Sequence, residues 1–158
     1  MYKRQEALDH LAATMPDLPV PRVIRRHDGA AAAAVTDLSG DERIAWVISA
    51  IDGLPLGAMR PHPAALVHEI GHTLGRMTAG LEGFDHAALT RDFKWHPLQP
   101  HWAFTEVFEI LDEDIKSLIN KYFQIFENDI ESELLNLEYQ TIHCDGNDYN
   151  LLVSPSLD

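Results

Sequence analysis

The chain has 158 residues, which is enough for one ordinary domain and too few for two large ones. Its 25 acidic residues outnumber its 12 Lys and Arg, and the resulting net charge of −13 argues against a nucleic-acid partner, because phosphate contacts need clustered cations. Only one cysteine and no long apolar run are present, so we expect no disulfide framework, no membrane span and a cytoplasmic protein.

The first third of the chain predicts one short helix followed by strands. Apolar spacing over residues 6–15 predicts a helix that ends at Pro16. A weaker signal predicts a strand over 22–26. Residues 30–35 could form a strand or, by the propensity of their alanines, a helix, and the flanking turns favour the strand. The β-branched and aromatic run over 44–51 predicts the best strand of the chain, and the turn residues that follow, Asp52 and Gly53, end it.

The remainder of the chain is mostly helical by pattern. Apolar residues recur at three and four positions over 63–81, which predicts a helix of about five turns. Residues 83–100 are irregular in pattern. The acidic stretch 104–139 predicts helix again, with a break near 127–129, and short strands are predicted over 140–143 and 151–153. The order of these elements indicates an α+β fold.

One motif on the predicted helix 63–81 has the form H-E-x-x-H. His68 and His72 are four residues apart and therefore share a helix face, where both could bind one zinc ion with Glu69 as general base. The longer zinc-peptidase pattern requires a third histidine at position 78, where this chain has Thr78, and no spacing rule supports His86 instead. A zinc metallopeptidase is thus retained as an alternative reading.

A second motif lies between the two last predicted strands. It has the form His-x-Asp-x-x-x-x-Asn, from His143 through Asp145 to Asn150, with apolar residues on both sides. An aspartate on such a loop can accept or orient the proton of a substrate hydroxyl. An amide five residues later can turn back toward a metal ion that nucleotide phosphates hold. This spacing predicts phosphoryl transfer.

At these residues the chain resembles the catalytic loop of the aminoglycoside phosphotransferase and choline kinase-like family, with Cys144 where that family commonly has Gly. The segments 17–23, 52–56, 71–86 and 91–95 are similar to the hydroxylysine kinase-like branch of the family. The resemblance implies a protein kinase-like α+β fold with a small lobe of strands and a mostly helical large lobe. In it, the H-E-x-x-H helix is an ordinary helix of the large lobe.

The resemblance also implies roles for individual residues. Asp145 would be the catalytic base, His143 would brace the loop, and Asn150 would bind Mg²⁺. The positions expected to line the adenine or guanine pocket of ATP or GTP are Ile48, Ala50 and Asp52. The reaction would transfer a γ-phosphoryl group to the hydroxyl of a small, amine-bearing substrate such as hydroxylysine.

Two features of the family are not found at the expected places, namely the strand Lys that pairs with the phosphates and a second metal-binding Asp. We therefore expect a truncated member, with residues 1–55 as a partial small lobe with its linker and residues 56–158 as a truncated helical lobe. Very low activity, and self-association or contact with other domains of a parent chain, would follow. A third reading is a non-catalytic helical interaction module built on residues 104–139.

Overall fold

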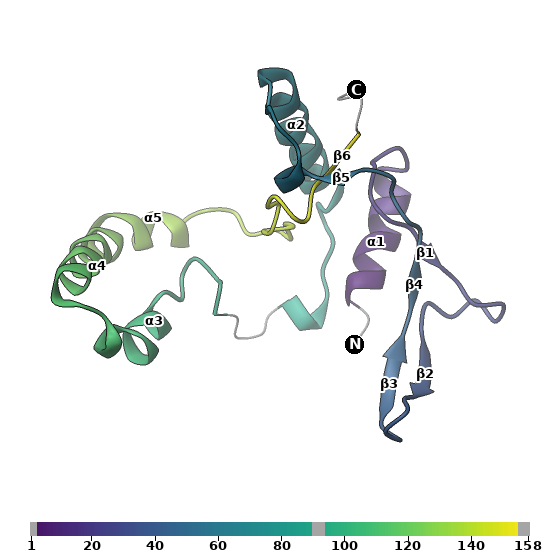
Figure 1. Cartoon of the computed structure of the whole chain (residues 1–158), viewed down its shortest axis with the longest axis horizontal. Helices are drawn as coiled ribbons and strands as arrows, with labels where there is room; N and C mark the ends of the chain where they lie inside the picture. The colour runs from purple at the N-terminus through teal and green to yellow at the C-terminus, as the bar shows by residue number, and fades with distance from the viewer. Residues whose placement is uncertain (1–2, 90–93, 155–158) are drawn as a thin grey trace. The chain divides into compact units, whose positions relative to one another are not determined.

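The computed structural model describes residues 3–89 and 94–154, which form helices and short antiparallel strand pairs (Figure 1). The chain forms two compact units, one holding the residues up to Leu89 and from Gln140 onward, the other residues 90–139. The elements of the first unit are α1 (Lys3–Thr14), β1 (Val23–Ile24), β2 (Ala33–Thr36), β3 (Glu42–Ala45), β4 (Val47–Ile48), β5 (Leu54–Pro55), the 3₁₀ turn η1 (Leu56–Ala58), α2 (Ala64–Gly80), the 3₁₀ turn η2 (Ala87–Leu89) and β6 (Leu152–Val153). Those of the second are α3 (His101–Glu106), the 3₁₀ turn η3 (Phe108–Ile110), α4 (Glu113–Ile125), the π turn η4 (Phe126–Ile130) and α5 (Glu131–Leu135).

The small core of the first unit lies where α1 meets α2. Leu11, Leu18 and Leu81 are 4%, 2% and 4% exposed and pack together. The two helices approach closely at Gly80, where an added Cβ would come within 2.7 Å of the Met15 side chain. The carbonyl of Gly80 accepts a hydrogen bond from the Thr14 hydroxyl at 2.7 Å, which fastens the same crossing.

Three antiparallel strand pairs complete the first unit: β1 with β4, β2 with β3, and β5 with β6. The predicted strand over 44–51 is wrong as a single element. Its first part belongs to β3 and pairs with β2, while its second part is β4 and pairs with β1. Trp46 lies between the two parts, so the apolar run contributes to two strands that pair with different neighbours.

The strand predicted over 140–143 is also wrong. These residues are irregular and are fastened by side chains instead of by a strand partner. Gln140 Nε2 donates to the Thr78 carbonyl at 3.2 Å, and the Thr141 hydroxyl donates to the Phe84 carbonyl at 3.0 Å. The chain therefore rejoins the first unit against the end of α2 and the segment that follows it.

In the second unit, the α-helical stretch divides where the sequence predicts a break. Residues 127–129 lie in the π turn η4 between α4 and α5, so they stay helical but leave the α form. A further interruption, which the sequence does not predict, falls between α3 and α4. Leu111 and Asp112 are extended there, and Asp112 is the N-cap of α4. Glu113 and Asp114 in the first turn favour a helix start at this point, because carboxylates stabilise the positive end of the helix dipole.

The other helix and strand predictions are confirmed in position but not in their exact bounds, since α1 starts three residues earlier than predicted and the strands are shorter than predicted. The predicted helices 6–15 and 63–81 are α1 and α2, and the predicted strands 22–26, 30–35 and 151–153 are β1, β2 and β6. Residues 83–100 are irregular apart from η2, with 90–93 outside the described residues.

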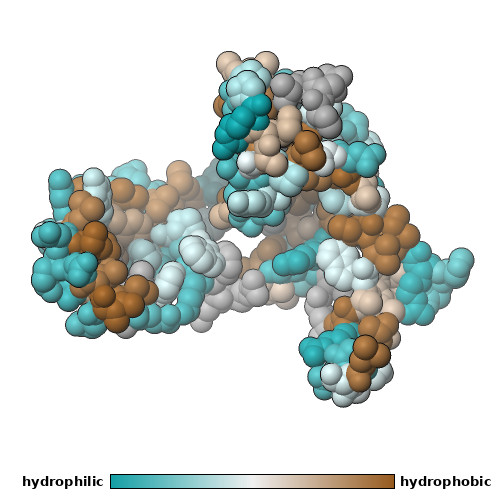
Figure 2. Space-filling view, viewed as in Figure 1, coloured by the Kyte–Doolittle hydropathy of each residue, from teal (hydrophilic) through white to brown (hydrophobic). Residues whose placement is uncertain are grey.

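Many large apolar side chains are exposed in both units. On β3 and β4, Ile44 is 46% and Val47 61% exposed, and on α4, Leu118 is 51% and Tyr122 60% exposed. Figure 2 shows apolar residues open to view over the β2–β3 hairpin. Self-association stays a prediction that these surfaces favour. Among the described helices, none combines the length and the apolar character that a bilayer crossing requires.

One surface ion pair ties the α1–β1 connection to α2. Arg76 donates to Asp17 Oδ2 at 2.7 Å. This hydrogen bond is the largest of the effects that lower the pKa of Asp17. Because the carboxyl of the folded protein has the lower pKa, the pair stabilises the fold above the ordinary aspartate range. That contribution is lost as pH falls through the pKa of the folded state.

We therefore expect Asp17→Asn to flatten the acid limb of the stability profile, measured as melting temperature between neutral pH and pH 3. Arg76→Gln should flatten the profile in the same way, since it removes the same bond from the other side. A normal acid limb in either variant would contradict the assignment. The effect should be small because both side chains reach solvent.

Candidate functional site

The loop 143–150 belongs to the first unit and is attached to the segment that follows β4. Directly after the loop, β6 pairs with β5, with Leu54 opposite Val153 and Pro55 opposite Leu152. Two more backbone bonds extend this contact: Leu56 N donates to Leu151 O and Gly57 N donates to Asp148 O, both at 2.9 Å. The loop and residues 54–57 thus form one continuous backbone ladder.

Glycines allow the close approaches on both sides of this loop. Gly53 has φ +157°, and a Cβ there would lie 3.1 Å from Leu152 Cβ and from Val153 O. A Cβ added at Gly146 would lie only 3.0 Å from the Leu74 side chain of α2, which is a tight contact. The loop is therefore held between residues 53–57 and α2.

We expect Gly53→Ala to destabilise the protein by about 2 kcal/mol, because it adds backbone strain and a contact with backbone atoms that cannot move aside. The free energy of unfolding from denaturant titration measures this. Gly71→Ala is the matched control, since a Cβ at Gly71 meets nothing within 4 Å and the residue lies inside α2. The control should be neutral or stabilising by up to about 1 kcal/mol. Equal effects of the two substitutions would refute the close approach.

Asp145 and Asn150 contact each other directly. The Asn150 side-chain Nδ2 donates to Asp145 Oδ2 at 2.7 Å and to the Asp145 carbonyl at 2.9 Å. With its amino group held in this way, Asn150 retains its side-chain oxygen as an acceptor or ligand. Both residues are exposed, so a substrate or ion can reach them from solvent.

His143 and Cys144 shape the entry into the loop. His143 Nδ1 accepts a hydrogen bond from Asp145 N at 3.3 Å, a contact within the loop itself. Cys144 has φ +59°, which is the left-handed region that favours glycine. The backbone thus accounts for Gly being common at this position in proteins with a similar loop.

Asn147 is a site residue that the sequence did not single out. Its Nδ2 donates to Asp145 Oδ1 at 2.7 Å, and its Oδ1 accepts from Tyr149 N at 2.9 Å and from Asn150 N at 3.2 Å. The available signal was the Asn in a turn-forming Asp-Gly-Asn-Asp run, since such side chains bond the backbone two residues on. That signal predicts the turn but not the bond to Asp145.

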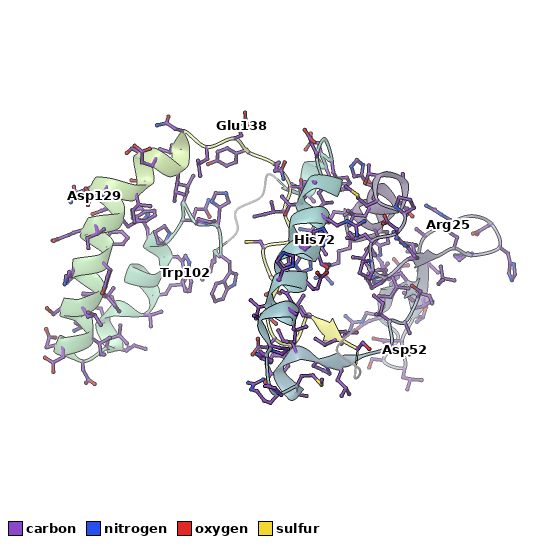
Figure 3. All side chains as sticks on the ribbon, turned by 90° about the horizontal axis from the view of Figure 1, so that it is seen from above. Arg25, Asp52, His72, Trp102, Asp129 and Glu138 are labelled. Atoms are coloured by element: carbon purple, nitrogen blue, oxygen red, sulfur yellow. The ribbon has the colours of Figure 1, made fainter. Side chains whose placement is uncertain are left out.

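The three positions expected near a nucleotide base lie before Gly53. They are therefore outside the segment 54–57, whose backbone pairs with the loop 143–150 and β6. Ile48 is the last residue of β4 and pairs with Val23, with its side chain 40% exposed. Ala50 and Asp52 are exposed in the irregular segment that leads into β5 (Figure 3, which labels Asp52). Their contact with a base stays a prediction.

The H-E-x-x-H residues are exposed on α2, where Figure 3 labels His72. Glu69 lies 3.3 Å from His68 Nδ1 and 3.6 Å from His72 Nδ1, and the three side chains are 78%, 67% and 56% exposed in chain order. Over residues 3–89 and 94–154, no group of three His, Cys, Asp or Glu side chains is placed to hold a metal ion. The zinc peptidase reading therefore finds no support.

Comparison with known proteins identifies the family of the chain and not the roles of individual residues. A family model described as a phosphotransferase enzyme family matches residues 2–157. No curated protein and no solved structure matches the chain. The family implies a protein kinase-like fold, with which the mixture of helices and small antiparallel strand pairs is compatible. Since the match spans nearly the whole sequence, the chain belongs to the phosphotransferase enzyme family.

Proposed function

We propose that the loop 143–150 is the phosphoryl-transfer loop of a small-molecule kinase. The observation that carries this proposal is the direct contact between Asp145 and Asn150, five residues apart in the sequence. In the proposed roles, Asp145 accepts or orients the proton of the acceptor hydroxyl, and His143 supports the loop through the backbone of Asp145. Family membership supports phosphoryl transfer as the reaction class.

Asn150 is the residue proposed to hold Mg²⁺. Its amino group is bonded to Asp145, which leaves an amide oxygen, and oxygen is the ligand type that Mg²⁺ prefers. Mg²⁺ usually keeps several waters and binds one or two protein groups together with nucleotide phosphates, so a sparse protein site fits the ion. When bound, the ion would neutralise charge on the phosphates.

The segment that holds Ile48, Ala50 and Asp52 is proposed to contact the base of ATP or GTP. This segment is exposed and continues directly into β5, whose partner β6 follows Asn150. Binding at the segment and chemistry at the loop would therefore share one backbone support. The proposed acceptor is a small alcohol that carries an amine, in keeping with the acidic surplus of the chain and with its resemblance to hydroxylysine kinase-like proteins.

Transfer of radiolabelled γ-phosphate to hydroxylysine, from ATP or from GTP with Mg²⁺, tests the proposal. We expect slow transfer by the wild type and a loss of about 100-fold or more in Asp145→Asn, because a positioned base contributes that much. Asp148→Asn makes the same change three residues away in the same loop and should retain the rate. Transfer that is undetectable in the wild type, or equal in both variants, would overturn the proposal.

A further inference from the structure

We infer that Asn147 is a positioning residue that sets the relative placement of Asp145 and Asn150. The expected effect on nucleotide binding rests on the proposed function of the loop, whereas the hydrogen bonds of Asn147 do not depend on it. Asn147 contacts the carboxylate of one residue and the backbone of the other: Nδ2 donates to Asp145 Oδ1 at 2.7 Å, while Oδ1 accepts from Asn150 N at 3.2 Å. One short side chain thus spans both members of the proposed pair.

The side-chain amides of Asn147 and Asn150 each donate a hydrogen bond to a different oxygen of the Asp145 carboxylate. Asn147 donates to Oδ1 and Asn150 donates to Oδ2, each at 2.7 Å. A carboxylate with a separate donor on each oxygen cannot rotate about its last bond without losing one of them. Asn147 therefore fixes the orientation of the Asp145 carboxylate, and Asn150 alone would leave Oδ1 without this donor.

The same residue also shapes the backbone that carries Asn150. The Asn147 side-chain oxygen accepts from Tyr149 N at 2.9 Å, and the Asn147 carbonyl accepts from Asn150 N at 3.0 Å and Leu151 N at 3.2 Å. These bonds form a tight turn that ends at Asn150. The turn brings the Asn150 amide back over Asp145, where it donates to the carboxylate.

An amide suits this task better than the other turn-forming side chains. Aspartate could accept from Tyr149 N, but it has no proton to donate and would add a second negative charge next to Asp145. Serine could cap the same turn more weakly, but it is too short to replace the amide donor at the carboxylate. A residue needed only for the turn could be serine, whereas a positioning residue could not.

This difference defines the experiment, which compares Asn147→Ser with Asn147→Ala. Asn128→Ser, at an exposed position in the second unit, is the matched control. Calorimetry measures the affinity for ATP with and without Mg²⁺. If Asn147 positions the pair, both variants should lose about tenfold in affinity with Mg²⁺, as is usual when a supporting partner of a metal ligand is removed. Affinity without Mg²⁺ should match the control in both variants, and the melting temperature of Asn147→Ser should match it too, since serine can still cap the turn.

Two results would overturn the inference. Wild-type affinity in Asn147→Ser with a defect only in Asn147→Ala would show that the residue serves the turn alone. Equal losses with and without Mg²⁺ would indicate general damage to the loop.

A readout without nucleotide keeps the inference separate from the proposed function. In the ligand-free protein, the side-chain amide resonances of Asn150 should shift and exchange faster with solvent in Asn147→Ser, because Asp145 is then less fixed. Unchanged Asn150 resonances would overturn the inference. If the wild type binds no nucleotide, the proposed function fails, and the positioning claim is decided by these resonances alone.

Discussion

Replacing Asn150 with alanine should weaken the binding of Mg²⁺-nucleotide by about 10- to 100-fold. The substitution removes the amide oxygen proposed to bind the ion and also the donor that holds Asp145 Oδ2 at 2.7 Å. Removing a residue that only supports a metal ligand typically costs about 10- to 100-fold, and removing the proposed ligand itself should cost about as much or more. Calorimetric titration with ATP and with GTP, each with and without Mg²⁺, measures the change.

The Mg²⁺-free titration is the internal control for this result. Affinity for the free nucleotide should change little, since the proposed contacts with the base come from residues 48–52 and not from the loop. Asn128→Ala removes an amide at an exposed position in the second unit and should bind as the wild type does. An Asn150→Ala variant that binds Mg²⁺-nucleotide normally would remove Asn150 from the site.

Replacing Leu18 with alanine should destabilise the first unit by about 2–5 kcal/mol. Leu18 is 2% exposed and packs with Leu11 and Leu81 in a core that has few other buried apolar side chains among the described residues. The substitution removes three buried carbons and leaves a cavity that the α1–α2 crossing cannot easily fill. Denaturant unfolding followed by circular dichroism gives the free energy.

Leu38→Ala is the matched control, because Leu38 lies fully exposed in the turn between β2 and β3. It should change the free energy of unfolding by less than about 0.5 kcal/mol. Since the loop 143–150 packs on α2 through Gly146 and Leu74, loss of this core should also release the loop. Comparable stability of the two leucine variants would show that the α1–α2 contact does not support the fold.

Local sequence patterns predicted an element well where its apolar residues all pack on one side or pair with one neighbouring element. The recurring apolar residues of α2 predicted its position closely, because a single helix face accounts for the pattern. The run over 44–51 was predicted as one strand, since β-branched residues report strand propensity and not the identity of the partner. Its division between β2 and β1 depends on contacts distant in the sequence.

The site was predicted to a similar extent. The spacing of His143, Asp145 and Asn150 indicated a shared loop, and the structure places the last two in direct contact. Asn147 was missed because an asparagine in a turn is common and its sequence context does not reveal where its amino group points. Similarly, the i and i+4 spacing of His68 and His72 was real, but spacing alone does not supply a third ligand.

The bonds from Gln140 to Thr78 and from Thr141 to Phe84 attach the chain to the first unit directly after residues 90–139. Both bonds lie within the first unit, so the length of the second unit does not alter them. Insertions or deletions between residues 90 and 139 should therefore be tolerated without disturbing the loop 143–150, and the two units can change in length and sequence independently.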